Sequence, residues 1–518
     1  MPNILRRDDI AFLLYDVLDI ERFSAHPHFA EGSRAVYDQI LDTAERMAEE
    51  VFQPFAAKLD ANEPSFDGTS VHIIPEVKKA VSAFAEAGFI GASFKAEDGG
   101  MQLPFTITEA VSAWFAAANW SAANYPALTV AAANLLATHG SAAQKERFLP
   151  AMLEGRYFGT MCLSEPHVGS SLGDMRTRAE PQDDGAYRLY GNKMWISGGE
   201  HELSENIIHF VLAKIPGGPP GVKGISLFIV PRILGAEEGR DGEKNDIALA
   251  SLNHKMGCRG TVNCALTFGE KDGAVGYLVG EPHKGLSYMF LMMNEMRIGV
   301  GMAAAALAYT GYLHALDYAK DRRQGRALTN RDPESPMVPI VEHADVKRML
   351  LQQKAYAEGA LAMTFYCASL VDEMAVGTPE QRRRAHLLLE LLTPIAKSWP
   401  SEFGLRANET AIQVLGGAGY TRDWPLERFY RDNRLNPIHE GTKGVQGMDL
   451  LGRKVAMENG AAFRALGEEI RTTIAAKPRL PEQEAALGEA LALAEIDARI
   501  GQERLRPGRG RGVDHSHG

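Results

Sequence analysis

The stretch Tyr187-Arg-Leu-Tyr-Gly-Asn-Lys-Met-Trp-Ile, residues 187–196, has the alternating side-chain pattern of a β-strand. Two further segments, Ile207-Ile-His-Phe-Val-Leu-Ala and Gly224-Ile-Ser-Leu-Phe-Ile-Val-Pro, are rich in β-branched and aromatic residues and are bounded by turn residues. Because no amphipathic helix lies between these segments, a barrel or sandwich is a better prediction than a doubly wound sheet. We therefore predict a central β domain over residues 158–282.

Helical periodicity marks the sequence on both sides of this block. Apolar residues recur every three or four positions before it, in residues 8–18, 32–59 and 74–87. Long amphipathic segments typical of a helix bundle follow it, at residues 286–322, 341–373, 378–398 and 402–415. The prediction is a multidomain α+β protein: an N-terminal helical domain (1–157), the β domain (158–282), a C-terminal helix bundle (283–465), and an extra helix with a disordered tail (466–518).

Residues 110–144 contain no Asp, Glu, Lys or Arg. Polar residues such as Asn119 and Asn124 interrupt this stretch, so buried core helices broken near Pro126 are a better prediction than a membrane span. The N-terminus carries charges where a signal peptide has its apolar core.

The composition limits the possible classes of protein. The chain has 518 residues, 45% of them hydrophobic and 23% charged, which is typical of several globular domains. Because the net charge is −11, no large basic surface is expected, and no nucleic-acid partner is predicted. Four cysteines without a CxxC pair favour a reducing, cytoplasmic location.

Glu440 is the first candidate for chemistry. It lies in Asn436-Pro-Ile-His-Glu-Gly-Thr-Lys-Gly-Val-Gln, a short loop between predicted bundle helices, where Thr442 can cap the following helix. A carboxylate that points from such a loop into a cleft would have a raised pKa and could act as a base. The alternative is an ordinary surface glutamate. Lys443 stands where a zinc motif HExxH needs its second histidine, and no metal site is predicted.

Other candidates each have a structural alternative. Residues 158–171 are predicted to be a strand that enters a Gly/Ser loop, and Trp195, with Ser197 beside it, could cover a flat cofactor ring or simply fill the core. Arg322 could bind phosphate or belong to a solvated charge run. Arg297 interrupts an apolar helix and needs a partner, which Glu295 or another helix could supply. The glycines at 299 and 301 are predicted to permit close helix packing.

Taken together, these segments resemble the acyl-CoA dehydrogenase flavoproteins. The resemblance covers roughly residues 35–460 and rests on seven features that occur in the family's order: Cys162-Leu-Ser-Glu-Pro-His-Val-Gly-Ser, Gly191-Asn-Lys-Met-Trp-Ile-Ser, Lys255-Met-Gly, Arg297, Arg322, Gln413-Val-Leu-Gly-Gly-Ala-Gly-Tyr and Glu440-Gly-Thr. The opening Arg6-Arg-Asp-Asp-Ile and residues 199–209 are most similar to the long subgroup that includes 3-methylmercaptopropionyl-CoA dehydrogenase.

The resemblance implies a cofactor, FAD, between the β domain and the bundle. It implies that the following residues contact FAD: Met161, Leu163, Ser164, Trp195, Ser197, Arg322, Gln413, Gly417 and Thr442, with Arg322 and Gln413 reaching it from a neighbouring subunit of a homodimer or homotetramer. For the acyl-CoA substrate it implies Ser170, Asn294, Arg297 and Gly441.

The resemblance also implies a reaction. Glu440 would remove the α-proton of an acyl-CoA thioester, and its backbone N–H would bind the thioester oxygen. An electron-transfer flavoprotein would then accept the electrons, and a short or methylthio-substituted acyl chain is expected. His439 departs from the tyrosine that is usual beside the base and could alter its pKa. An acyl-CoA oxidase of the same fold and a low-turnover flavoprotein that binds nucleic acid are the alternatives.

Overall fold

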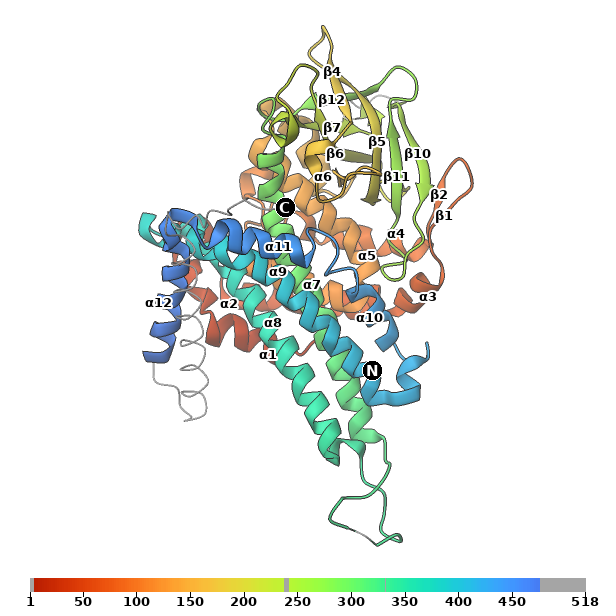
Figure 1. Cartoon of the computed structure of the whole chain (residues 1–518), viewed down its shortest axis with the longest axis vertical. Coiled ribbons are helices and arrows are strands. Elements are labelled where there is room, and N and C mark those ends of the chain that lie inside the picture. Colours follow the sequence, from red (N-terminus) through yellow and green to blue (C-terminus); the bar gives the residue numbers. More distant parts are fainter. Residues whose placement is uncertain (1–3, 237–241, 331, 476–518) are drawn as a thin grey trace, which may run out of the picture.

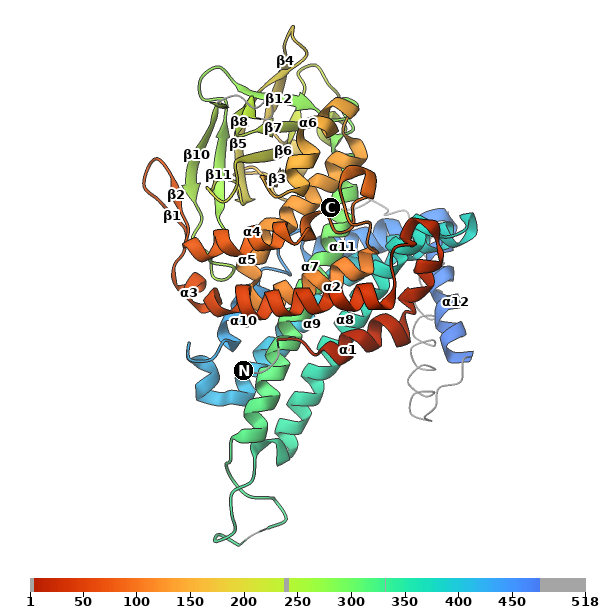
Figure 2. The ribbon, with the colours of Figure 1, turned by 180° about the vertical axis from the view of Figure 1, so that it is seen from behind.

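The computed structural model describes residues 4–236, 242–330 and 332–475, with the side chains of residues 291–294 left out. Figure 1 shows a β-rich part at one end of the molecule and long helices that extend away from it. Helices from both ends of the chain pack together below the β-rich part, as the view from behind in Figure 2 also shows. The predicted succession of helical, β and helical parts is confirmed. The predicted disordered tail lies outside the described residues.

The N-terminal part consists of helices joined by tight turns. Its main elements are α1 (Arg7–Ala11), α2 (Arg34–Met47), α3 (Ala56–Ala61), the hairpin β1 (Ser65–Phe66) and β2 (Val71–His72), α4 (Pro75–Glu86), α5 (Phe105–His139) and α6 (Ala142–Leu153). Ser33 caps α2, since its side chain accepts a hydrogen bond from the Val36 N–H. Ser141 and Gln144 form a complete capping box at the start of α6.

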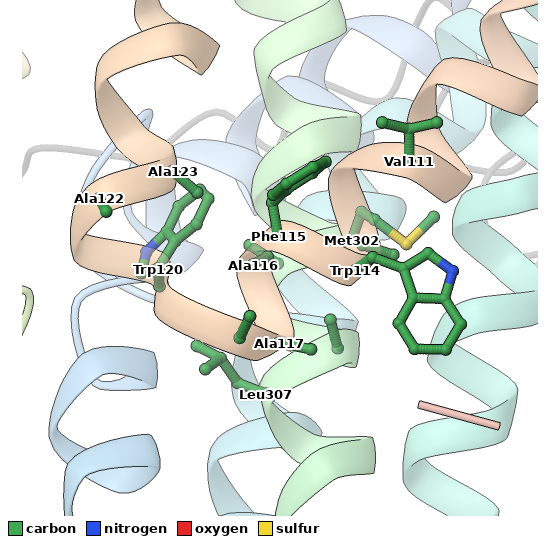
Figure 3. Close-up of a cluster of buried hydrophobic side chains, with 14 of the residues drawn as sticks. Val111, Trp114, Phe115, Ala116, Ala117, Trp120, Ala122, Ala123, Met302 and Leu307 are labelled. Carbon is green, nitrogen blue, oxygen red and sulfur yellow. The ribbon is translucent and has the colours of Figure 1, made fainter. Parts of the chain in front are cut away.

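The prediction of a break near Pro126 is wrong. Helix α5 continues through Pro126 and instead kinks at Asn119, which has φ −161° and ψ 82°. The Asn119 side chain stabilises the kink, because its amide donates to the Phe52 carbonyl (3.2 Å) and its oxygen accepts from the Ala122 N–H (3.3 Å). Around the kink, apolar side chains of α5, such as Trp114 and Phe115, face Met302 and Leu307 of α7 (Figure 3).

The β domain contains a closed ring of strands. Its strands are β3 (Tyr157–Cys162), β4 (Arg178–Pro181), β5 (Tyr187–Ser197), β6 (Asn206–Lys214), β7 (Ile225–Pro231), β8 (Ile233–Leu234), β9 (Glu243–Lys244), β10 (Ile247–Leu252), β11 (Asn263–Phe268) and β12 (Ala274–Leu278). Strands β5, β12, β7, β6 and β4 pair in that order, and β4 returns to β5. Strand β3 pairs in parallel with β6 at the end of the sheet. Helix α5 packs against β3, where the Gly159 N–H donates to the Thr129 hydroxyl (3.1 Å).

The C-terminal bundle is built on three long helices. They are α7 (Gly285–Asp321), α8 (Ala344–Val376) and α9 (Pro379–Leu415), and the shorter helices are α10 (Leu426–Asn433), α11 (Lys443–Asp449) and α12 (Ala461–Ala475). The two helices predicted at 378–398 and 402–415 are one, because α9 continues through Pro394 and Pro400. Gly301 of α7 covers the Ala396 carbonyl that Pro400 leaves without a helical donor: a Cβ there would lie 2.0 Å from that oxygen.

Helices α7 and α8 are long and apolar enough to cross a membrane by length and composition alone. Both pack against α9 and contribute many fully buried residues to the core, which is typical of the central helices of a bundle. They are therefore weak evidence for a membrane span.

All four cysteines are free and buried. Cys162 and Cys264 lie on β3 and β11, Cys258 lies where the β domain meets α10, and Cys367 lies inside α8. Burial raises the pKa of Cys162 and of Cys367 to about 12, and it also raises the pKa values of Cys258 and Cys264.

Candidate active site

The loop between α10 and α11 has an unusual backbone at Glu440. Glu440 has φ 51° and Gly441 has φ 89°, so two consecutive residues are left-handed. Glycine adopts this conformation readily, but a glutamate does so only when its surroundings hold it there. The conformation turns the loop sharply just before α11, whose N-cap is Thr442: the Thr442 hydroxyl accepts from the Val445 N–H (3.4 Å), as predicted.

Two buried side chains hold the carbonyl groups of this loop. Lys397 of α9 donates from Nζ to the carbonyl oxygens of Asn436 (2.7 Å) and Gly441 (2.8 Å), at the two ends of the loop. Gln446 of α11 donates to the Glu440 carbonyl (2.9 Å). The Glu440 carbonyl and the Gly441 N–H belong to one peptide, so the contact with Gln446 turns this N–H away from Gln446. The N–H groups of Glu440 and Gly441 donate to no residue that the structure describes. They are therefore available to a ligand.

The Glu440 carboxyl group lies in a balanced electrostatic environment. It is half-buried, and burial raises its pKa, whereas the positive charges of Lys397 and Arg297 lower it. A carboxylate whose pKa is raised in this way is a stronger base than one in water, and the nearby charges keep it ionised. The geometry therefore favours a proton acceptor and not an ordinary surface glutamate.

A chain of amide side chains fixes the position of His439. Asn433 donates to Asn408 (2.7 Å), Asn436 donates to Asn433 (2.9 Å), and Nε2 of His439 lies 3.0 Å from the Asn436 side-chain oxygen. Since that oxygen can only accept, Nε2 carries the proton. Burial, with a smaller effect of Lys397, lowers the pKa of His439 to about 3, so the imidazole is neutral at pH 7 and adds no charge beside Glu440.

Five of the nine predicted cofactor residues lie at the adjoining ends of β3 and β5. The Met194 N–H donates to the Ser164 carbonyl (2.9 Å), which places the end of β3, with Met161 and Leu163, beside the end of β5. Trp195 follows on β5 with φ 64° and is 61% exposed, so it is no core tryptophan. Ser197 accepts a hydrogen bond from Asn263 (3.0 Å) and keeps its own proton to donate.

A buried ion pair supports this arrangement. Lys193 donates to the Leu163 carbonyl (3.0 Å) and to the Glu165 carboxylate (3.2 Å), and both side chains are almost completely buried. Burial alone would raise the pKa of Glu165, but Lys193 and donors from Arg176 and Thr177 outweigh it and hold the pKa below its usual value. The pair ties the end of β3 to β5, two residues before Trp195.

The structure does not show all the predicted substrate residues beside Trp195 and Glu440. Arg297 is only 2% exposed and pairs with Asp449 of α11 at 3.1 Å, so another helix supplies its partner and Glu295 does not. Glu295 instead accepts a hydrogen bond from Asn134 of α5. Ser170 is exposed in the loop after β3. The side chain of Asn294 lies outside the described residues.

Three predicted cofactor residues lie far from Glu440 within one chain. Arg322 comes 25 residues after Arg297 on α7, about 37 Å along a helix. Gln413 and Gly417 lie near the far end of α9, 16 and 20 residues after Lys397, and all three side chains or backbones are exposed. Figure 1 places the ends of α7 and α9 away from the β domain. One chain alone therefore does not bring these residues to Trp195.

Sequence reasoning missed several residues of the site. Lys397 and Gln446 hold the loop, yet each stands in a helix whose pattern gives no sign of a loop contact. A lysine at a buried position of an amphipathic helix was the available signal for Lys397. Outside this loop, the sequence reasoning also did not single out Glu109 of α5, which is 7% exposed and whose Oε2 has no hydrogen-bond partner in the described part of the chain. Burial and the charge of Glu295 raise its pKa to about 8.

Family models match nearly the whole described chain. The models for the N-terminal, middle and C-terminal domains of acyl-CoA dehydrogenase match residues 36–156, 160–270 and 283–455. A 3-methylmercaptopropionyl-CoA dehydrogenase of Ruegeria pomeroyi is 41% identical over 77% of this chain and 68% of its own length. The broad-specificity linear acyl-CoA dehydrogenase FadE5 of Mycobacterium tuberculosis is 35% identical over 93% of this chain and 80% of its own length.

Solved structures have the same fold at lower identity. ACDH-11 of Caenorhabditis elegans, in complex with C11-CoA, has a TM-score of 0.76 and 19% identity over 96% of this chain and 81% of its own. Butyryl-CoA dehydrogenase of Megasphaera elsdenii has a TM-score of 0.65 and 24% identity over 81% of this chain and 98% of its own. With three consecutive domain models and close relatives in agreement, the chain belongs to the acyl-CoA dehydrogenase family, oxidoreductases that act on the CH–CH bond of acyl-CoA.

Proposed function

We propose that this protein introduces an α,β double bond into a short acyl-CoA thioester, with Glu440 as the base. One observation carries the assignment: a half-buried glutamate in a left-handed conformation, with its carboxyl group near Lys397 and Arg297 and its backbone N–H without a partner in the described chain. Such strain is kept at a residue only when other contacts enforce it, and it is frequent at active sites.

The chemistry needs two things from this loop. The α-proton of a thioester is weakly acidic, so the Glu440 carboxylate must lie against it in a site that excludes water. Negative charge grows on the thioester oxygen as the proton leaves, and a backbone N–H must stabilise that charge. The free N–H of Glu440 can do this, so one residue would serve as base and as donor. Gly441 completes the turn that makes both groups available to the substrate.

The residues at the end of the β domain fit FAD. An exposed indole suits the face of a planar ring, and polar groups could bind the edge of that ring. Ser164, Ser197, Met161 and Leu163 lie at the adjoining ends of β3 and β5. Thr442 uses its hydroxyl oxygen to cap α11 and keeps a proton to donate. When bound, FAD would accept the hydride from the β-carbon. Trp195 would cover the ring and exclude water from it.

The separation of Arg322, Gln413 and Gly417 from Trp195 supports a homodimer or homotetramer. In such an assembly these exposed residues would reach the cofactor of a second copy, where Arg322 would bind a phosphate group. An electron-transfer flavoprotein is the proposed acceptor of the electrons. The four buried, unpaired cysteines suit a reducing cytoplasm.

The proposed substrate is a short-chain or methylthio-substituted acyl-CoA, such as 3-methylmercaptopropionyl-CoA. Its support is the 41% identity to an enzyme named for that substrate. FadE5 has a broad specificity for linear substrates, and two butyryl-CoA dehydrogenases of Syntrophomonas wolfei are also similar, at 34% and 36% identity. Ser170 and Arg297 would lie along the CoA chain, and Asn294 beside them on α7.

The test of the base is Glu440→Gln, with the exposed Glu380→Gln as control. The amide nearly matches the carboxylate in shape but cannot take a proton, so we expect a loss of kcat of about 10³-fold or more with FAD retained. The control should stay within twofold of wild type. Activity of Glu440→Gln within a few-fold of wild type would place the base elsewhere.

The test of the substrate is a panel of acyl-CoA thioesters from C3 to C14, with the methylthio compound included, assayed with a dye acceptor. A shallow pocket should give the highest kcat/KM near C4 or C5, because longer chains gain no further burial. A maximum at C12 or longer would contradict the proposed substrate and leave the role of Glu440 untouched.

A further inference from the structure

Lys397 lies on α9 where this helix meets the loop between α10 and α11, and it is 0% exposed. A buried ammonium group is costly unless it is paired and hydrogen-bonded. In the described part of the chain, however, no carboxylate lies within 4.0 Å of its Nζ. Its hydrogen bonds go to two neutral carbonyl oxygens, those of Asn436 and Gly441. The ammonium group is therefore stabilised by carbonyl groups of the loop between α10 and α11 and not by an adjacent carboxylate.

The two carbonyl groups bound by Lys397 enclose Glu440 in the sequence. Drawing the Gly441 carbonyl into the bundle fixes the peptide that follows the left-handed Glu440 and Gly441. Gln446 fixes the peptide between these two residues through the Glu440 carbonyl. Because the C=O and N–H of a peptide point in opposite directions, these contacts turn the N–H groups of Gly441 and Thr442 away from the bundle.

The charges that face Glu440 come from two helices. Lys397 belongs to α9 and Arg297 to α7. Arg297 is already paired with Asp449 of α11, which also pairs with Arg453 (2.8 Å), so much of its charge is balanced locally. His439 is neutral. Lys397 is thus the cation near Glu440 that has no carboxylate partner of its own among the described residues.

We propose that Lys397 is a positioning residue for the base: it holds the loop in its left-handed conformation and supplies the positive charge that keeps Glu440 ionised before the substrate binds. This inference rests on the proposed function of Glu440. A neutral hydrogen-bond donor would suffice for a purely structural tie. The lysine is kept despite the cost of its burial because its charge acts on the carboxylate. Burial lowers the pKa of Lys397 to about 8, and Glu440 opposes that shift.

The decisive variants are Lys397→Met and Lys397→Arg in the full-length holoenzyme. Without the positive charge the pKa of Glu440 rises, so the acidic limb of kcat/KM for Lys397→Met should move up by one pH unit or more. We expect kcat to fall at least 50-fold with KM changed less than threefold. Arginine keeps its charge at every accessible pH, so Lys397→Arg should leave the acidic limb within 0.3 pH units of wild type and move any alkaline limb near pH 8 to higher pH.

The control is Lys454→Met. Lys454 is also a buried lysine that contacts α9, but its partner is the Glu390 carboxylate and not the loop. Its loss should change stability without moving either limb of the pH profile. FAD content and thermal unfolding are measured for every variant. If Lys397→Met fails to fold, the movement of the alkaline limb in Lys397→Arg decides the question.

The outcomes separate this inference from the proposed function. An acidic limb of Lys397→Met that coincides with wild type, or a loss of activity that matches its loss of FAD, would overturn the role of Lys397. If Glu440→Gln remains inactive in that case, the assignment of the base stands. If Glu440→Gln is active, both proposals are wrong.

Discussion

Single residues of this protein are held in costly states where the chemistry is proposed. Glu440 and Trp195 both have a positive φ, and they lie on opposite sides of the proposed cofactor site. Each is held by hydrogen bonds of its neighbours: Lys397 and Gln446 for Glu440, and the Met194 N–H for the strand that carries Trp195. The side chains themselves are left free for ligands.

At this scale the sequence predicts identities better than contacts. For Glu440 and Trp195, the residue type and its loop or strand left an ordinary structural alternative open, and only the order of the motifs along the chain singled them out. The role of Thr442 as a helix cap could be predicted from its position alone. The contacts of Lys397 and Gln446 could not be predicted, because their partners are backbone carbonyl groups, which every residue type carries. For Lys397, only its buried position on an amphipathic helix hinted at a special role. The sequence also could not predict that His439 is neutral, because burial in the folded protein is the main cause of its lowered pKa.

Glu109 gives a prediction about stability and pH. The folded state raises its pKa from 4.5 to about 8, first through burial and then through the charge of Glu295. Between these pH values the folded state holds a proton that the unfolded state has released, so this residue lowers the free energy of unfolding as pH rises. Glu109→Gln should remove this pH-dependent loss of stability. Relative to wild type, we expect its free energy of unfolding to be higher by about 1–3 kcal/mol at pH 8.5 and by less at pH 5.

Urea unfolding at pH 5, 7 and 8.5 measures this effect. The exposed Glu86→Gln, on the neighbouring helix α4, is the control and should show no such trend. A difference between Glu109→Gln and wild type that stays constant across the three pH values would mean that the carboxyl group is satisfied in the folded protein.

Among the elements, the helices show where local patterns fail. Periodicity predicted α4, α7 and α8 within a few residues. It placed a break at Pro126 and another between residues 398 and 402, because proline usually ends a helix. In α5 the side chain of Asn119 bends the helix elsewhere, and in α9 the close approach of Gly301 covers the carbonyl that Pro400 leaves unpaired. Both corrections depend on tertiary contacts that a single sequence does not contain.

Two glycines of α7 make a matched pair for testing this packing. In Gly301→Ala the new methyl group would meet the Ala396 carbonyl at 2.0 Å and force α7 away from α9, which should destabilise the protein by about 1–3 kcal/mol. In Gly299→Ala the nearest atom, Glu109 Oε1, is 4.0 Å away, so the gain in helix propensity should stabilise it by about 0.5–1 kcal/mol. Thermal unfolding of both variants checks this. Equal effects would refute the packing role of Gly301.

For the whole molecule, the order of helical, β and helical parts could be predicted because the periodicity changes abruptly twice along the chain. The sequence could not predict how Arg322 and Gln413 are placed relative to Glu440. Arg322 and Gln413 lie at the far end of the bundle from Glu440, and a linear motif order does not say whether one chain or two complete a site.

A mixing experiment tests the two-chain site. Arg322→Ala should weaken FAD binding by about 10–100-fold, equivalent to the loss of a charge-assisted hydrogen bond of about 1.5–3 kcal/mol. If a second copy supplies Arg322, co-expression of Arg322→Ala with Glu440→Gln should create some sites with both wild-type residues. Such mixtures should recover about a quarter of wild-type activity. If the mixtures are no more active than the two variants alone, a second copy does not supply Arg322 to the site that contains Glu440.

The four buried thiols turn the folded protein into its own reporter of local opening. Because each has a raised pKa and no access to solvent, a thiol reagent can modify it only when the surrounding part of the chain opens. Cys162 and Cys264 report on the β domain, Cys258 on its contact with α10, and Cys367 on the bundle. The order in which a mass spectrometer detects labelling at these positions would therefore give the order in which the parts of the enzyme come apart, without any engineered probe.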